Sequence, residues 1–514
     1  MKRTPYSNFA DQRSMLSRAS LFFFGALSVI AGQAQFDGYA LYNNQNSSTA
    51  YLIDASGAIA HSWSLPSNAN YAMAIKPNGN LVRGAVNAGN QLNGAAVGGK
   101  VQEFTPAGAL VWEFVYSTSN YVTHHDMCLM PNGNVLLTAW FVQTNAQLQA
   151  LGYTGNSAKW PTRIIEVQQN GSGGEVVWEW NMLDRFIQYV DASKPNYMTI
   201  AEHPERMNIN VVVQGGGGPG GGAGDWFHVN GIDYNEALDQ IAFSSRFASE
   251  IFVIDHSTTT AEAAGHTGGN AGMGGDFLFR WGKPANYGTT GTQTIAGAVH
   301  DVRWIKDGRP NAGYLQFVNN VGGPTGNTVI DAIEPPLNGY NYDRIPNTAF
   351  GPITYDWRHV CIANSAGQSA SDRMPNGNIF VALSDEYMYE VDEIGNIVWQ
   401  YNASPPKGFR YLCADPGIIA ILGANVCTLT TDVVEISSET IEAYPNPSTG
   451  AFVLSGIDAS QVTLITIVDG TSRSVRSVRN TLQVDLSDQA EGIYYMQVTL
   501  VSGKRVMKRI LVQH

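Results

Sequence analysis

Three histidines in this sequence share one position relative to the turn that follows each of them. They are His125, His228 and His300. Each lies eight residues before a residue of its turn, namely Gly133 in MPNGN, Glu236 in YNEALDQ and Gly308 in KDGRPNAG. A neutral imidazole is a competent nucleophile, and a second one can act as an acid or base because its ordinary pKa is about 6.5. If the three side chains meet in the fold, they could carry out group transfer.

An arginine and two amides are expected beside these histidines. His228 and Arg246 flank their turn symmetrically, so they should be cross-strand neighbours about 5 Å apart at Cβ. Asn230 lies two residues on and shares the face of His228, and the same reasoning places Asn319 opposite His300. Because an arginine fork holds a multi-oxygen anion, the set suits sulfuryl or phosphoryl transfer, in which positioning and charge stabilisation dominate.

Neighbouring residues extend this candidate site. His124 precedes His125, and successive residues of a regular strand point to opposite faces, so only one of them can face the shared side. His125 holds the shared position, which leaves His124 as an interface or supporting residue. Tyr71 and Ser369 take the same position in two further segments, and Trp140 could stack on an aromatic substrate.

Short repeats indicate the elements that must hold these residues. The motifs KPNGN at 76–80 and MPNGN at 130–134 and 374–378 each precede an apolar strand. A second motif, a few apolar residues that end in tryptophan, recurs at Trp63, Trp112, Trp178, Trp281 and Trp399. A hairpin followed by outer strands, repeated at this coarse period, is typical of propeller blades.

The repeats predict an all-β fold with a six-bladed β-propeller over residues 35–405. Strands at 36–65 would complete the sixth blade by pairing with the other end of the chain, which removes exposed sheet edges. The first strand of each blade lines the central channel, so the three histidines would meet on the axis. Five blades with a flanking hairpin are the alternative. The other predicted blades lie near 70–115, 121–180, 226–283, 298–358 and 371–403.

Composition agrees with a β-rich fold and argues against one class of partner. Charged residues make up only 14% of the chain, whereas glycine is abundant at 54 residues. The net charge is −13. Affinity for nucleic acid depends on neutralising phosphates with Lys and Arg, so we expect no nucleic-acid partner.

The N-terminus is predicted to be a signal peptide over residues 1–34. Basic residues precede the apolar run 21–31, and Gly-Gln-Ala at 32–34 provides a cleavage site. A membrane anchor is the alternative, but the run is about half the roughly 20 residues that a spanning helix needs, and no other segment could span a bilayer. In an oxidising compartment Cys413 and Cys427 could close a short loop.

Two other functions compete with group transfer. Histidine rings on propeller axes also bind metals, since neutral imidazole is a common ligand for zinc, iron or copper. The charge of Arg246 would oppose a bound cation. The chain could also be a non-catalytic surface propeller that binds glycan or protein.

Three segments carry a resemblance to a known family. THHDMCLMPNGN, DWFHVNGIDYNEALDQIAFSSRFASEIFVID and GAVHDVRWIKDG followed by YLQFVNN resemble the bacterial aryl-sulfate sulfotransferase family, over about residues 70–405. That family is a six-bladed propeller that passes a sulfuryl group from an aryl sulfate to a histidine and then to a phenol, without a nucleotide donor. The resemblance implies His300 as the sulfated nucleophile. It implies that His125, His228 and Arg246 stabilise the transferred charge and handle protons.

The resemblance completes the prediction of the site, with no metal and no cofactor. Val229 stands where some relatives carry a hydroxyl residue, which puts one sulfate contact in question, and His359 remains an alternative nucleophile. The predicted catalytic residues are His300, His228, His125 and Arg246, and the predicted substrate-binding residues are Asn230, His124, Asn319, Tyr71 and Trp140.

The C-terminal segment resembles a second family. After a predicted linker at 406–440, residues 441–514 carry YPNPSTG, GIYY and a basic last strand, as in the C-terminal sorting domain of type IX secretion cargo. We expect this segment to form a small β-sandwich; a merely structural extra domain is the alternative. The resemblance implies the type IX secretion machinery as a partner and a secreted or cell-surface protein of a Gram-negative bacterium.

Overall fold

The computed structural model describes residues 38–213, 224–293, 295, 298–424, 441–469, 474–479, 481–500 and 505–514. They divide into two compact units, the first ending at Leu422 and the second running from Gly423 to the C-terminus. The predicted signal peptide at 1–34 lies outside the described residues, as does the linker segment 425–440.

The described residues of the first unit contain six four-stranded antiparallel sheets. In order from the inner strand outward, three of these sheets are β28 (Gly408–Leu412), β1 (Gly38–Asn43), β2 (Thr49–Asp54) and β3 (Ile59–Ser64); β4 (Ala69–Ile75), β5 (Leu81–Val86), β6 (Gly99–Phe104) and β7 (Leu110–Val115); and β8 (Tyr121–Leu129), β9 (Val135–Phe141), β10 (Thr162–Asn170) and β11 (Gly173–Asn181).

The other three sheets follow in chain order, with short elements in the connections. These sheets are β14 (Val229–Asn235), β15 (Gln240–Ser245), β16 (Glu250–Asp255) and β17 (Phe277–Trp281); β18 (Val299–Trp304), β19 (Leu315–Asn319), β20 (Val329–Ile333) and β23 (Trp357–Val360); and β24 (Ala370–Arg373), β25 (Ile379–Ala382), β26 (Met388–Val391) and β27 (Ile397–Tyr401). The connecting elements are α1 (Asn145–Ala150), α2 (Thr260–Ala264), α3 (Pro416–Leu422), β12 (Phe186–Ile187), β13 (Met207–Asn208), β21 (Leu337–Asn338) and β22 (Asn341–Tyr342).

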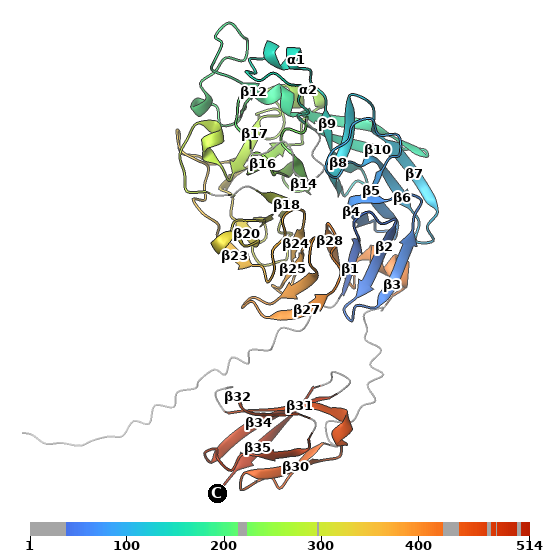
Figure 1. The fold of residues 1–514 in the computed structure, drawn as a ribbon, viewed down its shortest axis with the longest axis vertical. Coiled ribbons are helices and arrows are strands. Elements are labelled where there is room, and N and C mark those ends of the chain that lie inside the picture. The colour runs from blue at the N-terminus through green and yellow to red at the C-terminus, as the bar shows by residue number, and fades with distance from the viewer. Residues whose placement is uncertain are drawn as a thin grey trace, which may run out of the picture. The chain divides into compact units, whose positions relative to one another are not determined.

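The sheets form a propeller-like ring, which confirms the predicted all-β class. Inner strands of successive sheets contact one another in the order β4, β8, β14, β18, β24 and β28 (Figure 1). The ring closes where the backbone N–H of Ile75 in β4 donates to the Tyr411 hydroxyl in β28. The first sheet contains both ends of the unit, because β28 pairs antiparallel with β1. This closure by the two chain ends was predicted. The predicted linker begins too early, however, since β28 and α3 lie within residues 406–424.

The repeated tryptophans explain how neighbouring sheets are held together. Trp63 of β3 donates its indole N–H to the carbonyl of Thr105, 3.2 Å away in the next sheet. Trp399 of β27 donates in the same way to the carbonyl of Ala55 at 2.8 Å. Buried indoles need such a partner, so these two tryptophans fill the core and also link two sheets, whereas Trp112 donates to Glu103 within its own sheet.

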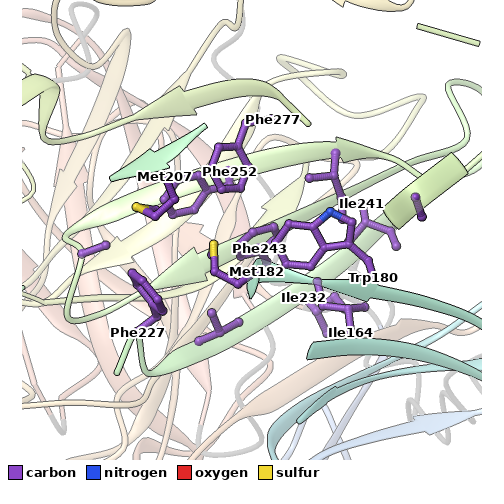
Figure 2. Close-up of a cluster of buried hydrophobic side chains, with 14 of the residues drawn as sticks. Ile164, Trp180, Met182, Met207, Phe227, Ile232, Ile241, Phe243, Phe252 and Phe277 are labelled. Carbon is purple, nitrogen blue, oxygen red and sulfur yellow. The ribbon is translucent and has the colours of Figure 1, made fainter. Parts of the chain in front are cut away.

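Apolar cores fill the spaces between sheets. One cluster joins sheets β8–β11 and β14–β17, where the Trp180 ring lies against Phe243 at a centroid distance of 5.5 Å (Figure 2). Phe252 and Phe277 continue the same cluster. This packing fixes the inner strands β8 and β14 relative to each other. Within the described parts of the chain, no helix has the length and apolar character needed to cross a membrane.

Inner strands share an irregularity that decides where their side chains point. The pairing shifts by a β-bulge between Thr123 and Met127 in β8 and between His300 and Arg303 in β18. Similar shifts occur in β4 and β14. Bulges reorient side chains near functional sites, so regular strand alternation does not apply here.

The second unit has the predicted sandwich form. A three-stranded and a four-stranded sheet share one apolar core that includes Phe452 and Ile465. Its strands are β29 (Glu442–Tyr444), β30 (Ala451–Ser455) and β33 (Gln483–Asp485), and β32 (Ser474–Val478), β31 (Val462–Val468), β34 (Gly492–Leu500) and β35 (Arg505–Val512).

Candidate active site

Three histidines from successive inner strands approach one another in the first unit. His125 comes from β8, His300 from β18, and His228 directly precedes β14. The rings of His125 and His228 have centroids 4.3 Å apart. Burial holds the pKa of His300 well below its ordinary value, and the charge of His228 lowers it further. Asn230, two residues after His228, donates to the carbonyl of Val299, which precedes His300. The fold thus brings together the segments that carry the three predicted imidazoles.

Backbone strain accompanies this arrangement. His125 has φ of 53° and His228 has φ of 50°, in the left-handed region that favours glycine. In β18 the left-handed residue is Asp301, with φ of 56°, one position after His300. Strain of this kind persists where the surrounding structure fixes it, and it concentrates at functional sites.

The orientation of His300 is set by a neighbouring amide. Its Nδ1 lies 2.6 Å from Oδ1 of Asn320, and Nδ2 of Asn320 donates to the carbonyl of Ser365 at 3.1 Å. Because the amide oxygen can only accept, Nδ1 of His300 is the protonated nitrogen. The lone pair is therefore on Nε2, which is buried and has no hydrogen-bond partner among the described residues.

The predicted partner of His300 was wrong by one residue. Val299 pairs with Asn319 and His300 pairs with Val318, whereas Arg303 pairs with Gln316 nearer the turn. Counting from the turn would place Asn319 opposite His300, but the bulge between His300 and Arg303 shifts the register. The Asn319 side chain donates instead to Asp331 at 3.1 Å.

A buried carboxylate orients His228. Nδ1 of His228 lies 2.5 Å from Oδ2 of Asp225, and Oδ1 of Asp225 accepts the Trp140 indole N–H at 3.0 Å. Burial acts to raise the pKa of Asp225, but the bond and charge of His228 bring it below the ordinary value. An imidazole held by a carboxylate at one nitrogen can exchange protons at the other. Sequence reasoning missed Asp225, although its spacing of three residues from His228 was a usable signal.

His124 and Trp140 pack beside His125. Nδ1 of His124 lies 2.8 Å from Nδ1 of His125, and the His124 ring stacks on Trp140 at 4.2 Å. Burial lowers the pKa of His124 to about 3. Trp140 is 1% exposed, and its ring face is taken by His124, so the structure places it as a support of the site. A stacking contact between Trp140 and an aromatic substrate stays a prediction.

Arg246 supplies the positive charge. Its backbone N–H donates to the carbonyl of His228 at 3.1 Å, as the symmetric hairpin predicted. The guanidinium is half-buried, and within the described residues it has no hydrogen bond or ion pair. The guanidinium and the His300 ring lie near one point, since a methyl group built on Gly367 would be 2.8 Å from Nη1 of Arg246 and 3.8 Å from Cε1 of His300. Free fork donors beside unpartnered imidazole nitrogens suit an anion.

Two further predicted residues, Asn230 and Tyr71, lie beside the site histidines. The Asn230 amide bridges two sheets, since it donates to the carbonyl of Val299 at 2.7 Å and accepts from Ser244 at 2.7 Å. The Tyr71 ring meets His125 edge-on at 5.9 Å. Asn230 thus holds β18 beside β14, next to His300, and Tyr71 flanks the imidazoles.

The alternative nucleophile lies elsewhere in the same sheet. His359 is on β23, the outermost strand, and its Nε2 is 3.0 Å from the Tyr389 hydroxyl. Burial lowers its pKa to about 4. This position separates His359 from the inner-strand imidazoles.

The cysteines of the described chain differ in their state. Cys413 is disulfide-bonded, while Cys128 and Cys361 are free. Position 427, the expected partner, is outside the described residues. No group of three or more His, Cys, Asp or Glu side chains suited to a metal ion occurs in the part of the chain that the structure describes.

The site consists of imidazoles carried by or next to inner strands, with an arginine beside them, in a propeller-like all-β unit. The sequence model of the arylsulfotransferase (ASST) family matches residues 19–329, which is more than half of the chain and includes all three histidines and Arg246. The chain therefore belongs to the arylsulfotransferase family, and this membership supports an aryl sulfotransferase activity in general. No curated protein matches it significantly.

A second family model and several solved structures complete the comparison. The secretion system C-terminal sorting domain matches residues 442–513, which implies export and secretion or surface attachment. A protein of unknown function from Bacteroides caccae is 10% identical, with 73% of this chain and 99% of that chain covered and a TM-score of 0.40. BamB from Moraxella catarrhalis is 12% identical (72% and 75% covered, TM-score 0.29), and the Dos1 propeller is 10% identical (72% and 86%, TM-score 0.32).

Proposed function

We propose that the protein transfers a sulfuryl group from an aryl sulfate to a phenol through a sulfohistidine at Nε2 of His300, without a nucleotide donor. One observation carries the proposal. Asn320 fixes the proton of His300 on Nδ1 and leaves a buried, unpartnered lone pair on Nε2. Burial also keeps this imidazole neutral, as a nucleophile requires.

The two half-reactions can be written with the residues present. Nε2 of His300 attacks sulfur, the sulfur–oxygen bond to the aryl group breaks, and the departing phenolate takes a proton from His228. An acceptor phenol then gives its proton back to His228 while its oxygen attacks sulfur and the nitrogen–sulfur bond breaks. Asp225 holds His228 in the orientation for both proton transfers. The charge of Arg246 stabilises the sulfuryl oxygens.

Intact-mass analysis after brief exposure to a chromogenic aryl sulfate tests the proposal. We expect the wild type to gain one sulfuryl group and to lose it when a phenol is added. His300→Asn should give no adduct, whereas His359→Asn, in the outermost strand of the same sheet, should still form it. An adduct on His300→Asn would refute the assignment of the nucleophile, and a wild type without adduct or turnover would refute the reaction.

We also infer that residues 1–34 act as a signal peptide and that the type IX secretion machinery recognises residues 442–513. The match to a sorting domain supports this route. The test is secretion in a bacterium that has this machinery: the full chain should reach the medium or cell surface, and a chain that ends at residue 440 should stay in the periplasm. Equal export of both chains would contradict the inference.

A further inference from the structure

A fully buried lysine contacts the residues that follow two of the site histidines. Lys407 precedes the closing strand β28 and is 0% exposed. Its Nζ is 2.7 Å from Oδ2 of Asp126 and 2.7 Å from Oδ1 of Asp301. These carboxylates belong to the residues that directly follow His125 and His300. One ammonium group thus joins the segments that carry two site histidines.

The same carboxylates bind several other inner strands. Oδ2 of Asp126 accepts the backbone N–H of Ile232 in β14 at 2.9 Å. Oδ2 of Asp301 accepts the backbone N–H of Ser371 in β24 at 3.2 Å and Nε of Arg303 at 2.9 Å. With Lys407 beside β28, the network reaches five of the six sheets.

Stability alone is a poor reason for this network. Moving an ammonium and two carboxylates out of water is costly, and apolar residues of similar size often stabilise a core equally well. The network coincides with strained backbone, because His125 and Asp301 both have left-handed φ values. Two carboxylates bound to the same ammonium would hold these two bulges in the conformation that presents the imidazoles.

We propose that Lys407 is a positioning residue for sulfuryl transfer, which ties the bulges bearing His125 and His300 together through Asp126 and Asp301. The inference rests on the proposed function. Lys407 touches neither donor nor acceptor and acts only through the two carboxylates. Its role is distinct from ring closure, because the β28–β1 ladder closes the ring by backbone pairing.

The charge of Lys407 gives this role a measurable signature. Among the described residues, the charged or titratable groups that influence His300 electrostatically include Arg246, His228, His125 and Lys407. Burial acts first to lower the pKa of His300, and the positive charges lower it further. Removal of the ammonium should therefore raise the pKa of His300 toward its ordinary value. The uncompensated carboxylates would act in the same direction.

The chain offers a matched control on the same strand. Arg410 of β28 and Glu390 form a second buried pair, with Nη2 and Oε2 3.0 Å apart and both side chains 0% exposed. This pair links β28 to β26, away from the segments of His125 and His300. Arg410→Met therefore removes a buried cation from the closing strand without changing the carboxylates that follow the two histidines.

The experiment compares Lys407→Met, Lys407→Arg and Arg410→Met in the full chain, with a chromogenic aryl sulfate and a phenol. We expect Lys407→Met to lower kcat about 10- to 100-fold, to change KM less than about threefold, and to move the acid limb of the kcat profile to higher pH. Lys407→Arg should restore part of the rate and the original limb. Arg410→Met should lose thermal stability to a similar degree but keep the wild-type kcat and pH limb.

A second readout does not depend on turnover. Ring-labelled histidine NMR, with the His300 signal assigned by His300→Gln, should show the titration midpoint of His300 move upward in Lys407→Met and stay in place in Arg410→Met. If the wild type turns over no aryl sulfate, the proposed function fails and this titration still decides whether Lys407 acts on His300. If Lys407→Met does not fold, Asp126→Asn is measured in the same way. Wild-type kcat, pH limb and midpoint in the folded variant would overturn the proposal.

Discussion

Nδ1 of His124 and Nδ1 of His125 lie 2.8 Å apart. One of these nitrogens must donate and the other must accept, so the two rings cannot both be charged. Burial lowers the pKa of His124 to about 3 and holds that of His125 well below the ordinary value. Adjacent residues of a regular strand could not share this bond, and it forms because the β8 bulge turns both side chains to one side.

This bond predicts the effect of replacing His124. His124→Phe keeps a ring that can stack on Trp140 but removes the only described partner of Nδ1 of His125. We expect kcat for an aryl sulfate to fall about 10-fold, because the His125 ring and its tautomer are no longer fixed. Steady-state kinetics and a thermal melt check this. A kcat equal to that of wild type would show that His125 needs no support.

The Asp225–His228 bond predicts a larger effect. Asp225→Asn keeps the size of the side chain but removes the carboxylate that accepts from Nδ1 of His228. We expect kcat to fall about 100-fold with a small change in KM, since the proton exchange at His228 is misaligned. Trp140→Phe removes the indole donor to Oδ1 of Asp225, an atom that also accepts the backbone N–H of His228, and is the matched control. If both variants lose the same activity, Asp225 serves packing and not orientation.

The sequence was sufficient to predict a residue's position where that position could be counted from a nearby turn. The histidines were found from their spacing to a turn, and Arg246 was found because its hairpin is symmetric about the turn. The same count failed for Asn319, because a bulge lies between the turn and His300. A bulge of this kind depends on contacts from other strands, and the sequence carries no clear signal for it.

Contacts between residues far apart in the sequence could not be predicted either. Lys407 lies 281 residues from Asp126, in a segment interpreted as linker, and nothing in its surroundings marks it as buried. Asn320 adjoins Asn319 and could have been proposed as the partner of His300. Only the observed strand register shows that Asn320, and not Asn319, bonds to His300. The all-β class and the pairing of the chain ends were predictable because sequence repeats indicate the fold. Buried ionic contacts form only when distant segments meet in the folded ring, so the sequence does not predict them.

Gly367 provides a test of the arginine. A methyl group on its Cα would lie 2.8 Å from Nη1 of Arg246 and 3.8 Å from Cε1 of His300. Gly367→Ala should displace the guanidinium and raise KM for the aryl sulfate about 3- to 10-fold, with a loss of stability below about 1 kcal/mol. Gly173→Ala, whose added methyl would meet only ordinary contacts at 3.7 and 4.0 Å, is the control. An unchanged KM in Gly367→Ala would mean that Arg246 does not hold the donor.

A histidine away from the site makes stability depend on pH. Nδ1 of His256 lies 2.7 Å from Oδ1 of Asp239, and Nε2 lies 3.0 Å from Oε2 of Glu166 in the neighbouring sheet. Burial acts to lower its pKa, but the two carboxylates raise it to about 9. A neutral ring has one N–H and can donate to only one of these carboxylates, so the bridge between the sheets requires the protonated form.

The sign of the pH effect follows from the raised pKa. Stabilisation by His256 is fully present below its unfolded pKa, about 6.5, and is lost as the pH rises through about 9. His256→Gln should therefore lower the free energy of unfolding of the first unit by about 1–3 kcal/mol at pH 6 and by much less at pH 10. All 11 tryptophans lie in this unit, so urea unfolding followed by tryptophan fluorescence measures it without the sorting domain. A difference between variant and wild type that stays constant or grows with pH would show that His256 does not bridge the sheets as a cation.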